Sequence, residues 1–287
     1  MKQPKSIDVI IPHFNNPHLI VETIESVLNQ TLKPNKVIVV DDGSSKPAKE
    51  ALQDFIIKGL VEYLEYTPNK GPNFARNFGL QHSTSEFVAF VDSDDKWLPN
   101  KLEEQMNVFE NSEFKDLGVV YCGYEYIDEE GKIKYNADVA KIRDDVRGNV
   151  FFLLTTGNYV ISSASGVLIK RKYIDEVGGF DENLRIGEDW EMWIRLSKVC
   201  SYDYVNKDLV QIRQHSGNHQ SKRIYVFENE MKLYTKMVQD NEISKSAKRN
   251  WALHLINKMR QEFPKKELLK IANRDLNKTT KKILFDA

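Results

Sequence analysis

Short apolar runs alternate with helical patterns over roughly the first hundred residues, and this alternation constrains the fold more than any other feature. The runs at residues 7–11, 37–40 and 87–91 are almost entirely apolar, which is typical of parallel strands covered on both faces of a sheet. Helical spacing separates them, and residues 61–66 indicate a further, alternating strand. This order predicts parallel β-α-β units and an α/β/α sandwich with a mostly parallel central sheet.

Charged clusters punctuate this pattern, and two of them directly follow apolar runs. In chain order they are Asp41-Asp42-Gly43-Ser44, Asp92-Ser93-Asp94-Asp95, Glu188-Asp189 and Arg213-Gln214-His215. A carboxylate at a strand end must be desolvated or paired, which costs stability, whereas ligands of open α/β sheets bind at that edge. We therefore expect a site for a divalent metal, a nucleotide diphosphate and a proton-accepting carboxylate.

Composition and cysteine usage indicate an ordinary globular protein. The 287 residues suffice for one large domain, with or without a smaller appendage. No apolar run approaches the roughly 20 residues that span a bilayer, and the first residues lead into a strand instead of a signal sequence. Cys122 and Cys200 have neither metal-site nor disulfide spacing. We therefore expect buried free thiols and a cytoplasmic protein.

The pattern becomes less regular after residue 98 and is wholly helical beyond about residue 222. We expect a main domain at residues 1–221, with a nucleotide-binding half at about 1–98 and an acceptor-side half at about 99–221. A C-terminal helical extension is expected at residues 222–287.

The end of the chain is strongly basic. Residues 241–287 contain 12 Lys or Arg and five Asp or Glu, a net charge of +7, while the whole chain carries −1. Two interpretations stay open: a solvated helical tail, or helices that contact an acceptor or an anionic membrane at its inner face. Outside this tail, nothing in the sequence indicates nucleic-acid binding.

The charged clusters and the segments around them resemble glycosyltransferase family 2. The resemblance covers roughly residues 6–221, and the order of the motifs makes it specific, because each motif alone is weak. It implies a GT-A fold, a nucleotide-diphosphate sugar donor, a divalent cation and inversion at the anomeric carbon. The matching segments are Ile10-Ile11-Pro12-His13-Phe14-Asn15, Ser26-Val27-Leu28-Asn29-Gln30-Thr31, Val40-Asp41-Asp42-Gly43-Ser44, Asn69-Lys70-Gly71, Ala75-Arg76-Asn77-Phe78-Gly79, Phe90-Val91-Asp92-Ser93-Asp94-Asp95, Gly187-Glu188-Asp189 with Arg195-Leu196, and Arg213-Gln214-His215.

The chemistry of sugar transfer explains why the cluster Asp92-Ser93-Asp94-Asp95 would be acidic. The pyrophosphate leaves as a highly charged anion, so Mg²⁺ or Mn²⁺ lowers the barrier as a Lewis acid, and such hard cations take oxygen ligands. Asp92 and Asp94 lie two residues apart, where an extended strand end directs both to one side. We expect Asp94 to bind the metal, Asp92 to bind the ribose or the metal, and Ser93 to lie beside the nucleotide. Asp95 is a candidate cap of the following helix.

For the nucleotide, the resemblance implies that Asp42 accepts a hydrogen bond from the base, usually the N3–H of uracil, while Asp41 holds the loop. UDP is favoured over GDP and dTDP only because it is the common nucleotide of the family that the chain resembles. Arg76 either reaches the donor phosphates or braces the loop through a salt bridge. His13 departs from the family pattern and receives no role. The other residues expected to line the nucleotide pocket are Pro12, Phe14 and Asn15.

For the acceptor side, the resemblance implies that Asp189 is the carboxylate base of an inverting transfer. An N-cap of the helix expected at residues 189–199 is the alternative for Asp189. Glu188 and Arg213 are placed on the acceptor or phosphate side. The resemblance gives His215 a metal or pyrophosphate contact, and a structural role for it stays open.

Three tryptophans are candidates for stacking on sugar rings. Trp190 is the candidate acceptor platform, Trp193 is expected in the core, and Trp97 is a further candidate.

Other classes of protein explain fewer of these residues. A sugar-phosphate nucleotidyltransferase would carry a Gly-rich phosphate loop after the first strand, where this chain has Pro12-His13-Phe14-Asn15-Asn16. A phosphohydrolase with an Asp-x-Asp nucleophile leaves Asp42 and Glu188-Asp189 unexplained. A non-catalytic sugar-nucleotide-binding protein of the same fold would be expected to lack some of the carboxylates. We therefore expect sugar transfer from a UDP-sugar to a hydroxyl of a glycan, lipid-linked or other acceptor.

Overall fold

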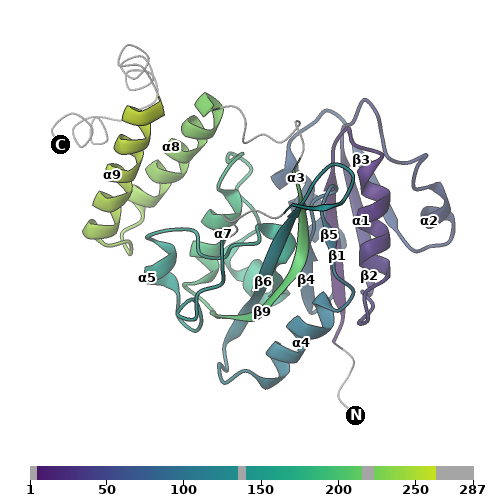
Figure 1. Cartoon of the computed structure of the whole chain (residues 1–287), viewed down its shortest axis with the longest axis horizontal. Helices are drawn as coiled ribbons and strands as arrows, with labels where there is room; N and C mark the ends of the chain where they lie inside the picture. The colour runs from purple at the N-terminus through teal and green to yellow at the C-terminus, as the bar shows by residue number, and fades with distance from the viewer. Residues whose placement is uncertain (1–4, 135–139, 215–222, 263–287) are drawn as a thin grey trace.

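The computed structural model of the chain describes residues 5–134, 140–214 and 223–262 (Figure 1). These residues form one nine-stranded sheet with the order β3-β2-β1-β4-β8-β6-β9-β5, and β7 pairs with β6. The strands are β1 (Ile7–His13), β2 (Lys36–Asp42), β3 (Glu62–Tyr66), β4 (Phe87–Phe90), β5 (Lys96–Trp97), β6 (Leu117–Ile127), β7 (Ile133–Lys134), β8 (Leu168–Lys170) and β9 (Ser201–Arg213).

Helices cover both faces of this sheet, as an α/β/α sandwich requires (Figure 1). They are α1 (Leu19–Leu28), α2 (Gln53–Ile57), α3 (Pro72–His82), α4 (Lys101–Asn111), α5 (Phe151–Leu154), α6 (Arg171–Val177), α7 (Glu188–Leu196), α8 (Arg223–Gln239) and α9 (Lys245–Glu262), with a 3₁₀ turn at Ala164–Gly166.

Strands β1 to β4 form the parallel half that the sequence predicted. β1 pairs in parallel with β2 and β4, and β2 pairs in parallel with β3. All of β1 is buried, as expected for a central strand with helices on both sides. Because these strands run in one direction, their carboxyl ends meet at the same edge of the sheet.

The second half of the sheet is mixed. β8 pairs antiparallel with β4 and with β6, whereas the long strand β9 runs parallel to β6. The short strand β5, which directly follows the acidic cluster at residues 92–95, pairs antiparallel with β9. The end of β9 therefore lies next to that acidic cluster.

Alternate residues of the strands enter two separate cores, because successive side chains point to opposite faces. Val9 and Ile11 pack on the face covered by α1 and α4. Ile10, Val40 and Phe90 pack on the face covered by α3, α6 and α7.

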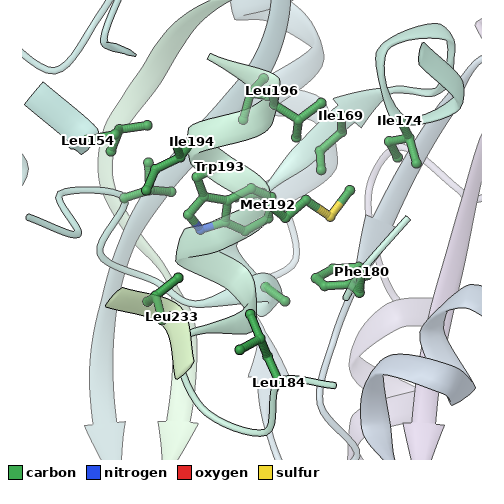
Figure 2. Close-up of a cluster of buried hydrophobic side chains, with 14 of the residues drawn as sticks. Leu154, Ile169, Ile174, Phe180, Leu184, Met192, Trp193, Ile194, Leu196 and Leu233 are labelled. Carbon is green, nitrogen blue, oxygen red and sulfur yellow. The ribbon is translucent and has the colours of Figure 1, made fainter. Parts of the chain in front are cut away.

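Helices α8 and α9 lie side by side at one end of the molecule, opposite α1 and α2 (Figure 1). Their apolar residues Leu233 and Trp251 belong to the same core as Trp193 of α7. Figure 2 shows Trp193 and Met192 among side chains from other elements, including Leu233. These two helices therefore pack against the helix that carries Glu188 and Asp189. Among the described helices, none combines the length and the apolar character that a membrane span needs.

Candidate active site

Asp42, at the end of β2, holds the loop that leads into α3. Its carboxylate accepts hydrogen bonds from the backbone N–H groups of Lys70 (2.6 Å) and Gly71 (2.7 Å), from the Asn69 amide (2.8 Å) and from the Tyr66 hydroxyl (2.9 Å). An ionised carboxylate has about four acceptor positions, so a contact with a base would require one of these donors to leave. The loop-holding role, expected for Asp41 alone, belongs to both residues.

Asp41 holds the turn that directly follows β2. Its carboxylate accepts hydrogen bonds from the backbone N–H groups of Ser44 (2.9 Å) and Ala48 (3.4 Å) and from the Tyr63 hydroxyl (2.6 Å). Asn15 is tied to the same turn, because its backbone N–H donates to Ser44 Oγ at 2.9 Å. The ends of β1 and β2 therefore form one connected rim.

The other residues at the end of β1 differ in exposure. Pro12 is buried, whereas Phe14 is 48% exposed and therefore accessible to a ligand on the rim. His13 is buried and its two ring nitrogens lack hydrogen-bond partners. Burial lowers the pKa of His13, and the charge of Asp41 opposes that effect. This is the behaviour of an uncharged, structural histidine.

Arg76, on α3, joins two of the predicted clusters. Its guanidinium donates to Asp92 at 2.7 Å and to Glu188 at 3.3 Å, and the side chain is only 5% exposed. Burial alone would lower the pKa of Arg76, but Asp92 and Glu188 outweigh that effect and the pKa is raised. Of the two expected roles, the described contacts are those of the salt bridge.

The acidic cluster after β4 divides into an exposed and a buried part. Asp92 and Asp94 are partly exposed, with Ser93 between them. Asp95 is buried and accepts hydrogen bonds from Ser165 Oγ (2.6 Å) and from the backbone N–H of Arg213 (3.2 Å). Burial, followed by the charges of Asp94 and Asp92, raises the pKa of Asp95 well above its usual range.

The expected capping role of Asp95 is wrong. Helix α4 begins at Lys101 and its N-cap is Asn100, so Asp95 lies too early in the chain to cap it. Its two hydrogen bonds instead join the acidic loop to the 3₁₀ turn and to the end of β9.

Glu188 and Asp189 are the first two residues of α7. Gly187 occupies the N-cap in the left-handed region with φ of 74°, where glycine is favoured. The N-cap alternative for Asp189 is therefore wrong, although Asp189 accepts a hydrogen bond from the Trp190 N–H at 2.7 Å. Burial, followed by the charge of Glu188, raises the pKa of Asp189 to about 7, and Arg76 opposes the rise.

The loop before α7 is held by two asparagines that the sequence analysis did not assign. The Asn73 amide donates to the carbonyls of Asp181 (2.9 Å) and Leu184 (2.8 Å). The Asn77 amide donates to the Phe180 carbonyl at 2.9 Å. Asn77 stands in a matched motif, so its position carried a signal, but its partner lies far away in the sequence.

The tryptophans differ from the expectation in one case. Trp193 is fully buried, as predicted. Trp97 is only 3% exposed, which contradicts a sugar-stacking role. Trp190 is partly exposed, and its ring centroid lies 4.4 Å from that of Trp251 on α9. One side of Trp190 is therefore occupied, and an acceptor platform on the remainder stays a prediction.

The structure corrects the placement of Arg213. Its side chain is fully buried, with Nη2 donating to Glu22 (2.9 Å) and Nη1 donating to the carbonyls of Asp128 (3.2 Å) and Glu129 (2.6 Å). Its Nε donates to the Asp94 carbonyl at 3.0 Å. Arg213 thus fastens the acidic loop from within the protein instead of facing an acceptor or phosphate. His215 lies outside the described residues.

Among the described residues, the carboxylates of Asp92 and Asp94 are the candidate cation ligands at this edge of the sheet. Within residues 5–134, 140–214 and 223–262, no group of three or more His, Cys, Asp or Glu side chains could hold a metal ion by itself. The two carboxylates are hard oxygen ligands on a partly exposed loop, and Mg²⁺ takes only one or two carboxylates when substrate phosphates supply other ligands. The donor set therefore fits a cation shared with a diphosphate.

The parallel strands, the helices on both faces and the carboxylates at one sheet edge define a GT-A glycosyltransferase fold. The family model "Glycosyl transferase family 2" matches residues 8–178, and the chain belongs to this family.

Curated relatives agree with this membership. An uncharacterized glycosyltransferase of Rickettsia typhi is 30% identical over 213 residues, which are 74% of this chain and 64% of that protein. The Bacillus subtilis protein named "Putative teichuronic acid biosynthesis glycosyltransferase TuaG" is 27% identical over 213 residues, covering 72% of this chain and 78% of that protein. The chain thus spans less than two thirds of the length of the rickettsial relative.

Solved structures share the fold at low sequence identity. Staphylococcus aureus TarS (1–349) in complex with UDP has a TM-score of 0.67 and 16% identity, covering 93% of this chain and 78% of that chain. The mannosyltransferase PcManGT from Pyrobaculum calidifontis, in complex with GDP-Man and Mn²⁺, has a TM-score of 0.62 and 17% identity. The match covers 99% of this chain and 84% of that chain.

Proposed function

We propose that the protein is an inverting glycosyltransferase that moves a sugar from a nucleotide diphosphate to an acceptor hydroxyl. The observation that carries this proposal is the Arg76 bridge between Asp92 and Glu188. It brings the acidic cluster suited to a metal–diphosphate next to the start of α7, where Asp189 has its pKa raised to about 7. The guanidinium of Arg76 thus lies between the proposed site of the leaving group and the helix that carries the candidate base.

The donor is proposed to lie along the edge of β1, β2 and β4. Phe14 and Asn15 line the base end of the rim together with the loop held by Asp42. UDP is our proposal for the nucleotide, supported by the TarS complexes with UDP and UDP-GlcNAc, while PcManGT binds GDP-Man. The sugar itself is left open by these relatives.

The proposed cation is Mn²⁺ or Mg²⁺, held by Asp94 and Asp92 together with the donor phosphates. When bound, it would neutralise the charge that develops on the leaving diphosphate. The Mn²⁺ of the PcManGT complex supports this proposal. We propose Asp94 as the direct ligand, and Asp92, which also accepts a hydrogen bond from Arg76, as a ligand of the ribose or of the cation.

Asp189 is proposed to take the proton of the acceptor hydroxyl. The acceptor oxygen then bonds to the anomeric carbon from the face opposite the diphosphate, and the bond between that carbon and the diphosphate oxygen breaks. A base with a pKa of about 7 is ionised in a large fraction of molecules at neutral pH and still accepts a proton effectively. Single displacement of this kind inverts the anomeric configuration.

For the acceptor we propose a hydroxyl of a glycan or of a lipid-linked glycan. The printed name of TuaG, a teichuronic acid biosynthesis glycosyltransferase, supports a polysaccharide. We also propose a cytoplasmic location, with the basic C-terminal helices as a contact to the membrane.

Thermal-shift screening of nucleotide sugars with Mn²⁺ tests the donor, because a ligand that binds only the folded state raises its stability. We expect UDP-sugars to raise the melting temperature more than GDP- or dTDP-sugars. Transfer to a glycan acceptor, followed by determination of the product anomer, tests the reaction. A product that retains the donor configuration would overturn single displacement.

A further inference from the structure

Arg185 occupies the space between the loop held by Asp42 and the start of α7. It follows Leu184, whose carbonyl accepts the Asn73 amide, so the position of its backbone is fixed by α3. A Cβ atom at Gly71 would coincide with the Arg185 guanidinium, which shows that this group lies directly on the Gly71 backbone. The absence of a side chain at Gly71 is therefore what makes room for Arg185.

This guanidinium has no protein acceptor within the described part of the chain. Arg185 is partly buried, yet it forms no hydrogen bond there and no carboxylate oxygen of a described residue lies within 4.0 Å of it. In contrast, Arg76 and Arg195 each bind carboxylates. Arginine carries five donors that match a carboxylate or phosphate, so a partly buried one without partners is suited to an external oxyanion.

The position of Arg185 indicates that the oxyanion belongs to the nucleotide-sugar donor. Gly71 donates its N–H to Asp42, which places Arg185 near the proposed base rim. The next residues along the chain lead through Gly187 to Glu188 and Asp189, at the proposed reaction centre. A nucleotide sugar that spans from the rim to Asp189 passes this position, and its oxyanions are its phosphates and the carboxylate of an acidic sugar.

We propose that Arg185 is a specificity-determining residue that binds an oxyanion of the donor, either a phosphate or a sugar carboxylate. The inference rests on the proposed function, because it requires a nucleotide sugar at this edge. Lys70, beside Gly71, adds positive charge to the same region, with its ammonium 4.1 Å from the centre of the Phe74 ring.

Calorimetric titration of Arg185→Gln with UDP, UDP-glucose and UDP-glucuronate, each with Mn²⁺, tests the proposal. Loss of a charge-assisted hydrogen bond is worth about 1.5–3 kcal/mol, or roughly 10- to 150-fold in affinity. A loss of this size with all three ligands identifies a phosphate as the oxyanion. A loss confined to UDP-glucuronate identifies a sugar carboxylate. Arg185→Lys should recover part of the affinity, because it keeps the charge without the fork.

The controls separate this proposal from a folding effect and from the donor proposal. Arg147→Gln removes an arginine paired with Glu113 and Asp203, away from the carboxyl ends of β1, β2 and β4, and should leave all three affinities unchanged. The melting temperature of Arg185→Gln should stay near that of wild type. Unchanged affinities for all three ligands in Arg185→Gln would overturn the role of Arg185. Failure of the wild type to bind any of them would overturn the proposed function, and this inference with it.

Discussion

Asp92, Glu188 and Asp189 have Arg76 as their common counter-charge. One positive charge for three carboxylates favours the protonated form of one of them. Asp92 and Glu188 are bound directly to its guanidinium, and Asp189 is influenced by it from farther away. Like charges close together disfavour ionisation, as does removal from water. Asp189 therefore retains its proton up to about pH 7, while its neighbours neutralise Arg76.

We predict that Asp189→Asn binds the donor normally but transfers sugar roughly 10²–10⁴-fold more slowly, the usual contribution of a general base. Asn keeps the shape of the side chain, and its amide oxygen can still accept the hydrogen bond that the Trp190 N–H donates to Asp189. Rates with saturating donor, together with calorimetric donor affinities, measure both effects. Near-wild-type transfer by Asp189→Asn would remove the base from the mechanism.

The pH dependence follows from the same residue. Only ionised Asp189 accepts a proton, so kcat/KM of the wild type should rise with pH through about 7 and level off above it. Folding stability should change in the opposite direction. An ionised carboxylate with a raised pKa is penalised in the folded state, so this residue lowers stability as pH rises from about 4 to about 7. Asp189→Asn should abolish the rise of kcat/KM and remove the contribution of Asp189 to the stability trend, while the contribution of Asp95, whose pKa is also raised, should stay.

We predict that Arg76→Gln destabilises the protein by about 3 kcal/mol, at the low end of the cost of breaking a buried ion pair, because Asp92 is 35% exposed. The variant should also move the rise of kcat/KM to higher pH, since Arg76 lowers the pKa of Asp189. Denaturant unfolding and a pH–rate profile measure these effects. Lys49→Gln, which breaks the exposed Lys49–Glu65 pair, is the control and should cost at most about 1 kcal/mol.

A related prediction concerns the cation. UDP affinity should fall in EDTA for the wild type, and Asp94→Ala should bind UDP equally weakly with or without Mn²⁺, because the cation links this carboxylate to the phosphates. Calorimetry with both proteins provides the four affinities. Equal affinity of the wild type with Mn²⁺ and with EDTA would contradict a metal-assisted site.

At the scale of elements, local periodicity revealed the parallel half but not the contacts that build the site. β1 and β2 are apolar over consecutive residues, so the sequence predicted them as buried strands. The Arg76–Glu188 ion pair and the docking of Asn73 and Asn77 onto the loop before α7 join distant parts of the chain. Such contacts leave no periodic signal, because their spacing is set by the fold.

Helices α8 and α9 support the helix that carries the candidate base. A Cβ atom at Gly187 would lie 2.9 Å from Leu233 Cδ2, so α8 packs directly on the N-cap of α7. The indole N–H of Trp251 donates to the Thr155 carbonyl at 2.9 Å, which fastens α9 to the end of α5. These contacts make the extension part of the site's framework.

We predict that Leu233→Ala costs about 2–5 kcal/mol of unfolding free energy, because Leu233 is only 1% exposed. It should also lower kcat more than it weakens donor binding, since Gly187 and Asp189 lose their support. Leu253→Ala on α9 removes a side chain of the same type that is 38% exposed, and should change stability by no more than about 0.5 kcal/mol. Equal stability of the two variants would show that α8 does not support α7.

For the whole molecule, the separation of charge orients the protein. The basic residues concentrate at 241–287, while the remainder of the chain is acidic. Exposed Lys245 and Arg249 lie on α9, at the end of the molecule away from α1 and α2 (Figure 1). An anionic surface would therefore attract the end of the molecule that carries α9. The carboxylates of the candidate site would repel the same surface.

We predict that the double variant Lys245→Gln/Arg249→Gln binds anionic phosphatidylserine vesicles more weakly than wild type, by about 1 kcal/mol for each charge removed. Both side chains are exposed, so the fold and the donor affinity should be unchanged.

Truncation near Asn241 is a poorer test, because removal of Trp251 uncovers the core and should give insoluble protein. Vesicle sedimentation at low and high salt measures binding, which should weaken with salt because the attraction is screened. Lys49→Gln/Lys58→Gln, which removes two exposed charges beside α2, should bind like wild type. If the wild type does not bind these vesicles, or binds them independently of salt, the proposed membrane contact of the basic helices is overturned.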